Sequence, residues 1–120
     1  MISGIGIDLI ELERVEKHIH NDAFINRVLT TAERETFDHL GDKRKVEFLA
    51  GHFSVKEAYA KAKGTGIGKS VSFQDLTVVN DSMGKPVLTD RTSDGCAIHV
   101  SITHTDHGAA AVAIIESLSC

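Results

Sequence analysis

The sequence predicts one compact domain of mixed helices and strands over residues 1–120, organised around a long helix at residues 43–63. That stretch contains no proline and a single glycine, and its apolar residues recur at helical spacing. Alternating aliphatic residues indicate strands near both ends of the chain. Because no Pro- or Ser-rich linker and no shift in composition divides the chain, we expect a single core.

The first predicted strand, residues 2–11, alternates aliphatic residues with Gly4, Gly6 and Asp8. Glycines inside a strand cost stability and usually mark a place where another backbone or a ligand comes close. Asp8 lies on the same face near the end of this strand, so it is a candidate functional residue. The alternative is that Asp8 caps a helix that begins a few residues later.

Three short helices are expected between this strand and the long helix, at residues 12–19, 24–29 and 31–40. Their cations alternate with glutamates, which is typical of a solvated face. The basic run 43–45 then begins the long helix, where the helix dipole disfavours cations. Either an anion binds near this run or the run only contributes to solubility.

Glu57 falls within the apolar arc of the long helix, so its carboxylate is directed inward and needs a cation or a proton as its partner. Lys61 follows four residues later, which places its ammonium beside that carboxylate. The alternative is an ordinary surface ion pair, the usual reason for a Glu four residues before a Lys. Since Glu57 lies in the apolar arc, we take Asp8, Glu57 and Lys61 as the candidate catalytic residues.

A glycine-rich loop follows the long helix, with glycines at positions 64, 66 and 68 between Lys63 and Lys69. Such a loop can present several backbone N–H groups to an anion. It is not a Walker A motif, because lysine occupies the position of the first required glycine and the loop follows a helix. A lone glycine-rich turn is a weak signal of phosphate binding.

The remaining residues predict strands at 76–80 and 86–88, followed by a hairpin of residues 98–103 and 109–115. The tip of this hairpin carries two histidines that are three residues apart, together with Thr105. Zinc is disfavoured because no further ligands have suitable spacing. Hydroxyl and imidazole groups suit phosphate binding equally well, and a simple polar turn is the remaining alternative.

The net charge of −4 argues against a general nucleic-acid-binding surface. No apolar stretch approaches the roughly 20 residues that span a bilayer, and the beginning of the chain does not resemble a signal peptide. We therefore expect a cytoplasmic protein with no nucleic-acid or membrane partner. Two carboxylates that converge from a strand and a helix suit Mg²⁺, which commonly binds one or two carboxylates together with substrate phosphates.

Three stretches carry a resemblance to a known family: GIGIDLIELERV at residues 4–15, FSVKEAYAKAKGTGIG at 53–68 and SITHTDHGAAAVAI at 101–114. They resemble the signatures of the holo-acyl-carrier-protein synthases, small single-domain 4'-phosphopantetheinyl transferases. The resemblance implies an α+β fold in which an antiparallel sheet packs against one long helix and short helices. It also implies a homotrimer with active sites between the subunits.

The implied reaction moves the 4'-phosphopantetheine group of coenzyme A to a serine of apo acyl carrier protein, in support of fatty acid biosynthesis. The products are holo acyl carrier protein and adenosine 3',5'-bisphosphate. By the same resemblance, Asp8 and Glu57 hold Mg²⁺ and Lys61 stabilises the transferring phosphate. Glu57, or a water held by the metal, removes the proton of the serine.

The resemblance also assigns residues that bind the two substrates. Arg44 would reach the nucleotide from a neighbouring subunit. The other coenzyme A contacts are expected from Lys63, Gly64, Thr65, His104 and Thr105. Arg14, helped by Lys17 or Arg27, would meet the acidic surface of the carrier protein, where complementary charge mostly raises the association rate.

Two positions depart from the family pattern, which commonly has arginine at His52 and serine at Thr103. His52 remains on our list of coenzyme-binding residues, but imidazole is mostly neutral at pH 7 and lacks the bidentate guanidinium. We therefore expect weaker or more pH-dependent coenzyme A binding. The rival functions are a magnesium-dependent nucleotide pyrophosphate hydrolase and a non-catalytic nucleotide-binding module.

Overall fold

The structure is a computed structural model that describes residues 1–118, and it confirms the α+β fold. The helices are α1 (Leu12–Glu16), α2 (Asp22–Val28), α3 (Thr31–Phe37), α4 (Asp42–Lys63) and the short 3₁₀ helix η1 (Phe73–Asp75). The strands are β1 (Ile2–Glu11), β2 (Leu76–Asn80), β3 (Pro86–Asp90), β4 (Cys96–His104) and β5 (Gly108–Ser117). The first helix ends at Glu16, earlier than expected, and residues 17–20 continue as turns.

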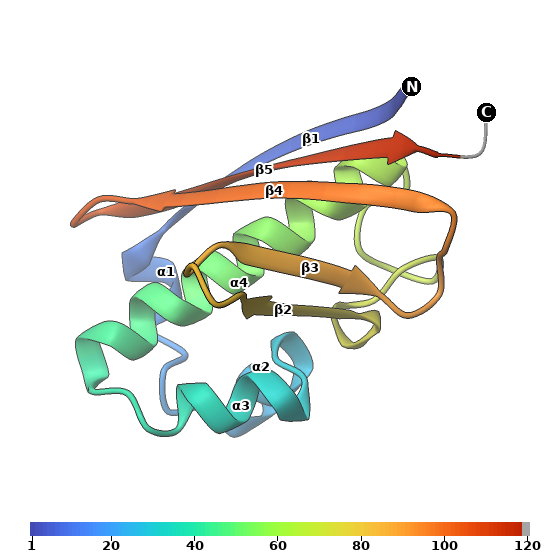
Figure 1. Ribbon diagram of the computed structural model, residues 1–120. Helices are drawn as coiled ribbons and strands as arrows, with labels where there is room; N and C mark the ends of the chain where they lie inside the picture. Colours follow the sequence, from blue (N-terminus) through green and yellow to red (C-terminus); the bar gives the residue numbers. More distant parts are fainter. Residues whose placement is uncertain (119–120) are drawn as a thin grey trace.

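The strands form a three-stranded antiparallel sheet in the order β1-β5-β4 and a separate hairpin of β2 and β3. Figure 1 shows α4 running beneath the three-stranded sheet, with α2 and α3 on the side of α4 away from that sheet. β3 extends to Asp90, two residues beyond the prediction, because Asp90 still pairs with Leu76 of β2. No helix among the described residues is both long and apolar enough to cross a membrane.

The glycines of β1 allow this strand to lie directly on the backbone of α4. A methyl group added to Gly4 would overlap the carbonyl oxygen of Ala62, and one added to Gly6 would overlap that of Ala58. The sequence-based expectation of a close approach is therefore confirmed, and the approaching backbone is that of α4. This contact brings Asp8, two residues beyond Gly6, against the middle of the helix.

The aliphatic face of β1 consequently points away from α4 and into solvent. Ile5, Ile7 and Leu9 are 67%, 68% and 75% exposed, respectively. They continue onto neighbouring β5, where Ile5 pairs with Ile114 and Ile7 pairs with Val112. A contiguous row of exposed aliphatic residues on a soluble domain usually marks an interaction surface.

The long helix α4 contributes to two hydrophobic clusters of the described residues. Leu49 and Ala50 pack with α1, α2 and α3, whereas Val55 and Tyr59 pack with β2, β3 and β5. The helix ends at Gly64, which adopts the left-handed conformation with φ of 84°. Because both clusters pack on α4, its rotation about its own axis is fixed, and with it the direction of each polar side chain it carries.

Candidate functional site

Asp8 and Lys61 form the centre of the site. The Lys61 ammonium donates to Asp8 Oδ1 at 3.1 Å and to the carbonyl oxygen of Ile7 at 3.1 Å. Lys61 was expected beside Glu57, but within residues 1–118 its ion pair is with Asp8. The reason is the close approach of β1 to α4, which puts a strand carboxylate within reach of the helix lysine. The structure thus brings all three candidate catalytic residues to one place.

Ser54 belongs to the same group, although the sequence pattern did not mark it as a candidate. Its side chain is buried, and its hydroxyl donates either to Asp8 Oδ2 at 3.2 Å or to the Asp8 carbonyl oxygen at 3.1 Å. The available signal was its spacing, since Ser54 lies three residues before Glu57 and seven before Lys61, on one helical face. Lys61 and Ser54 therefore offer one donor to each oxygen of the Asp8 carboxylate.

The alternative role of Asp8 as a helix cap is excluded by the geometry. The helix that follows begins at Leu12, and its N-cap residue is Glu11, which makes no side-chain capping hydrogen bond. Asp8 instead lies inside β1, where it pairs with Ala111 of β5. Its carboxylate is 14% exposed, which leaves it open to a ligand from one side.

Glu57 lies half-buried beside Asp8. Burial, and then the negative charge of Asp8, raise the pKa of the Glu57 carboxyl, while the cations Lys61 and Arg27 act in the opposite direction. Two carboxylates held together in a partly desolvated place repel each other, so the arrangement favours a proton or a bound cation. Glu57 therefore fits either a metal ligand or a proton acceptor.

The donor set for a metal consists of these two carboxylates. Within residues 1–118 no group of three His, Cys, Asp or Glu side chains is arranged to hold a metal ion. A closed zinc site would need such a group. Mg²⁺ binds one or two protein carboxylates and takes its remaining ligands from water and substrate phosphates. Asp8 and Glu57 fit that pattern, and the repulsion between them is the feature that a cation would relieve.

The glycine loop after α4 does not offer the free N–H groups that were expected. The N–H of Gly64 donates to the carbonyl oxygen of Lys61, and those of Thr65 and Gly66 both donate to that of Ala60. That expectation is wrong for these positions, because their N–H groups close the end of the helix. Anion binding here would depend on side chains, of which Lys63 and Thr65 are exposed.

The other expected coenzyme-binding residues lie around the N-terminal half of α4. Arg44, His52 and His104 line a cavity of about 280 Å³ together with Phe48 and Ile102, among others. In a straight helix, Arg44 and Lys63 would be roughly 28 Å apart along the axis. Within one chain, the expected coenzyme-binding residues therefore form two separate groups, one toward each end of α4.

His52 lines this cavity, but its ring nitrogens already have partners. Nδ1 lies 2.9 Å from the carbonyl oxygen of Phe48, and Nε2 lies 3.2 Å from that of Val78. The ring also stacks on Phe48, with centroids 3.9 Å apart. In this arrangement His52 offers no free N–H to a phosphate, so it shapes the cavity wall and links α4 to β2.

Thr105 fixes the hairpin tip that carries His104. Its hydroxyl oxygen accepts hydrogen bonds from the N–H groups of His107 and Gly108, both at 3.1 Å. His104 Nδ1 lies 3.8 Å from Glu47 Oε2 on α4. The tip is thus a well-formed turn next to the cavity that contains Arg44.

The residues expected to meet the carrier protein only partly share a surface. Arg14 and Arg27 line a cavity of about 350 Å³ together with His18, Phe24 and Phe53. The remaining lining residues are the aliphatic Ile10 and Val15, so every titratable group in its wall is basic. Lys17 is exposed but does not line this cavity.

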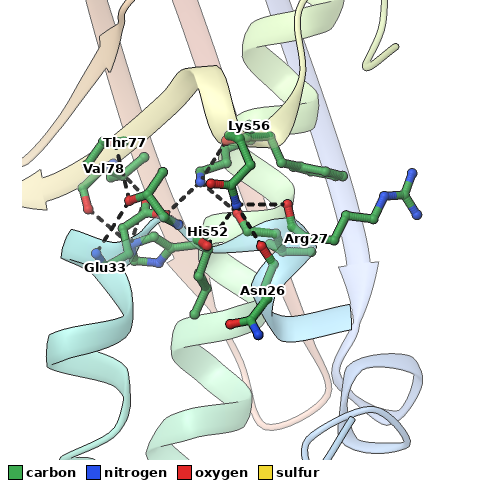
Figure 2. Close-up of polar contacts among 12 residues, drawn as sticks. Asn26, Arg27, Glu33, His52, Lys56, Thr77 and Val78 are labelled. Atoms are coloured by element: carbon green, nitrogen blue, oxygen red, sulfur yellow. Dashed lines mark hydrogen bonds and ion pairs between the residues drawn. The ribbon is translucent and has the colours of Figure 1, made fainter. Parts of the chain in front are cut away.

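Sequence reasoning missed a buried ionic cluster on the other side of α4, shown in Figure 2. Lys56 and Glu33 are fully buried and form an ion pair of 2.7 Å. Glu33 Oε2 also accepts the N–H of Val78 at 2.6 Å and lies 3.8 Å from His52 Nε2. The signal was present, because Lys56 lies three residues after Phe53, within the apolar stripe, where a solvated lysine is not expected.

With the geometry established, comparison with known proteins defines the class to which the chain belongs. The family model of the 4'-phosphopantetheinyl transferase superfamily matches residues 4–115. The chain therefore belongs to this superfamily.

Within the superfamily, the chain is similar to holo-[acyl-carrier-protein] synthases. The protein of that name from Geobacillus sp. (strain WCH70) is 57% identical over 120 residues, which cover 99% of this chain and all of the relative. The corresponding protein of Bacillus velezensis is 56% identical, with 99% of each chain covered. The crystal structure of the Bacillus anthracis holo-(acyl-carrier-protein) synthase in complex with CoA (3',5'-ADP) matches with a TM-score of 0.91, 50% identity and 98% of both chains covered.

Proposed function

We propose that this protein transfers the 4'-phosphopantetheine group of coenzyme A to a serine of apo acyl carrier protein. The products are the holo carrier and adenosine 3',5'-bisphosphate. The observation that carries the proposal is the convergence of Asp8, Glu57 and Lys61 where β1 crosses α4. The similarity to holo-[acyl-carrier-protein] synthases over nearly the whole chain supports the same reaction.

Asp8 and Glu57 are proposed to hold Mg²⁺. Their proximity supports this assignment, because burial and the negative charge of Asp8 raise the pKa of Glu57, and a cation between the two carboxylates would relieve this repulsion. When bound, the ion would polarise the phosphate under attack and neutralise charge on the departing bisphosphate. Ser54 and Lys61 keep the Asp8 carboxylate in one orientation by donating to its two oxygens.

The residues of the chain provide the remaining chemistry. In the proposed reaction the serine oxygen of the carrier attacks the phosphorus that bears the pantetheine arm, and the bond from that phosphorus to the bisphosphate breaks. Glu57 accepts the serine proton, a role supported by its raised pKa and partial burial. Lys61 balances the negative charge of the transferring phosphate while it remains close to Asp8.

The active unit is proposed to be a homotrimer with coenzyme A between subunits. One support is the exposed aliphatic face of β1, where Ile5, Ile7 and Leu9 lie uncovered. A second is the division of the expected coenzyme-binding residues into groups at opposite ends of α4, which one chain cannot bring together. The coenzyme site would then combine Arg44, His104 and Thr105 of one subunit with residues 63–65 of its neighbour.

The carrier protein is proposed to dock at the cavity that Arg14 and Arg27 line. Its wall combines two guanidinium groups with His18 and the rings of Phe24 and Phe53, and none of its lining residues is acidic. A surface of this kind suits an acidic partner with apolar residues among its charges. Lys17, outside the cavity, would add only long-range attraction.

The test is the intact mass of purified apo acyl carrier protein after incubation with this protein, coenzyme A and Mg²⁺. We expect a gain of one phosphopantetheine group, which is lost in Asp8→Ala and in the presence of a chelator. If coenzyme A is cleaved while the carrier stays unmodified, the hydrolase function replaces this proposal. If neither substrate changes with any of several carriers, a binding module becomes the better explanation.

A further inference from the structure

The carbonyl groups at the end of α2 are capped by side chains from distant parts of the chain. The last carbonyls of a helix have no partners within the helix and need donors from elsewhere. The Gln74 side-chain amide of η1 donates to the carbonyl oxygens of Asn26 at 2.7 Å, Arg27 at 3.3 Å and Leu29 at 2.9 Å. One side chain of η1 thus fastens three of the last four carbonyls.

Lys56 supplies the donor for the remaining carbonyl. Its ammonium donates to the carbonyl oxygen of Val28 at 2.7 Å, to that of Phe73 at 3.2 Å and to Glu33 Oε1 at 2.7 Å. Its three hydrogens therefore join α2, η1 and α3 to α4. The end of α2 and the segment that contains Gln74 are held by the same buried cation.

Arg27 is the residue of α2 whose position depends on this cap. Figure 2 shows its side chain extending away from the buried cluster. The guanidinium carbon lies 5.7 Å from the centroid of the Phe73 ring, so the residue that precedes Gln74 also supports Arg27. From there Arg27 lines the basic cavity with Arg14.

We propose that Gln74 is a positioning residue for the docking of the acidic carrier, because it caps the end of α2 and thereby holds Arg27 at the edge of the basic cavity. This inference rests on the proposed transferase function. Gln74 does not line that cavity or the cavity that contains Arg44, so it acts through Arg27 and not by touching either substrate.

The test compares steady-state kinetics of the full-length wild type, Gln74→Ala, Arg27→Ala and the double variant, with the carrier and coenzyme A varied separately. We expect Gln74→Ala to raise the KM for the carrier about three- to tenfold, with kcat and the KM for coenzyme A unchanged. In the Arg27→Ala background, Gln74→Ala should add no further increase, since the two residues act as one unit.

Arg91→Ala is the matched control. It removes the 2.8 Å ion pair between Arg91 and Asp75, which also belongs to η1, but leaves the α2 cap intact. We expect Arg91→Ala to leave the carrier KM unchanged, even if thermal unfolding shows that it loses as much stability as Gln74→Ala. The carrier KM of the wild type should also rise more steeply with salt than that of Gln74→Ala, because Arg27 contributes less in the variant.

Several outcomes would overturn the inference. An unchanged carrier KM in Gln74→Ala, an equal increase in Arg91→Ala, or a full additional increase in the Arg27→Ala background would each do so. A fall in kcat together with a rise in both KM values would show a general structural role instead. Failure of the wild type to modify any carrier would overturn the transferase function itself, which distinguishes the two results.

Discussion

Lys61 of α4 and Asp8 of β1 form an ion pair of 3.1 Å that joins the helix to the strand. The lysine is exposed on one side, whereas the carboxylate is largely covered. The pair therefore leaves one face of Asp8 accessible while its orientation is fixed. The Asp8 carboxylate also has the hydroxyl of the buried Ser54 as a hydrogen-bond donor. Two donors on one face of α4 therefore determine its orientation.

Removal of the Ser54 hydroxyl tests this arrangement. In Ser54→Ala the Asp8 carboxylate keeps Lys61 but loses the donor to Oδ2, so it samples other orientations. We expect the Mg²⁺ concentration that gives half-maximal activity to rise about three- to tenfold, in line with the loss of a residue that orients a metal ligand. Binding of Mn²⁺ to the protein without substrates, followed by electron paramagnetic resonance, should weaken in parallel.

Ser82→Ala is the control for this experiment, since Ser82 is exposed in the turn between β2 and β3. It should leave both measurements unchanged. Equal metal affinities in wild type and Ser54→Ala would show that Lys61 alone orients Asp8.

Gly6→Ala tests the contact between β1 and α4. The added methyl group would overlap the carbonyl oxygen of Ala58, and neither backbone can give way without moving the strand off the helix. We expect a loss of about 1–3 kcal/mol in the free energy of unfolding, measured with urea, together with a loss of activity because Asp8 moves. Gly41→Ala is the matched control, because no atom lies within 4 Å of its added methyl group and its φ is −73°.

The sequence was sufficient to predict the glycine face of β1, the extent of α4 and the meeting of Asp8 with Glu57. These features follow from periodicity, because a period of 2 or 3.6 residues decides which side chains share a face. The capping box of Thr30 and Glu33 at the start of α3 is equally local, because its two residues are three apart in the sequence.

The partners of individual side chains could not be predicted in the same way. Lys61 was assigned to Glu57 because helical spacing describes neighbours on one helix, whereas its partner Asp8 comes from another element. Lys56 was overlooked because a buried lysine requires acceptors from three separate segments, and sequence spacing does not bring these together. The first N–H groups of the glycine loop donate to the last carbonyl oxygens of α4, and the composition of the loop does not reveal this.

The burial of His52 gives a prediction for the pH dependence of stability. Burial, as the largest cause, lowers the pKa of His52 below its ordinary value of 6.5, although Glu33 and the carbonyl oxygens of Phe48 and Val78 act in the opposite direction. As the pH falls through 6.5, the unfolded chain takes up a proton that the folded protein does not. The folded state is therefore destabilised on the acidic side of 6.5 by this group.

We expect the free energy of unfolding to fall between pH 7 and pH 5 with a contribution from His52 of at most about 1.4 kcal/mol per pH unit. Urea unfolding of wild type and His52→Gln at several pH values measures this contribution as the difference between the two slopes. His20→Gln, which alters an exposed histidine, is the control. Identical slopes for wild type and His52→Gln would contradict the assignment, and His52→Arg shows separately whether a cation at this position changes the KM for coenzyme A.

Ile7→Glu tests whether the exposed face of β1 joins copies of this chain. Ile7 is 68% exposed in the single chain and borders a shallow groove of about 190 Å³ with Ser101, Thr103 and Val112. A buried carboxylate at a subunit interface is costly, so we expect the variant to lose trimers while each chain keeps its fold. Light scattering measures the mass, and far-UV circular dichroism verifies the fold. Val87→Glu, which alters an exposed aliphatic residue of β3, is the control.

The position of the coenzyme site between subunits has its own test, because Arg44 and Lys63 lie near opposite ends of one helix. If neighbouring subunits contribute them to one site, Arg44→Ala and Lys63→Ala are each weakly active alone. When the two variants are produced together in equal amounts, random assembly gives one intact site in four, so about a quarter of the wild-type activity should return. A mixture no more active than the separate variants would show that one chain supplies both residues. The Ile7→Glu substitution in both variants should abolish the recovery, because the intact site exists only where two subunits meet.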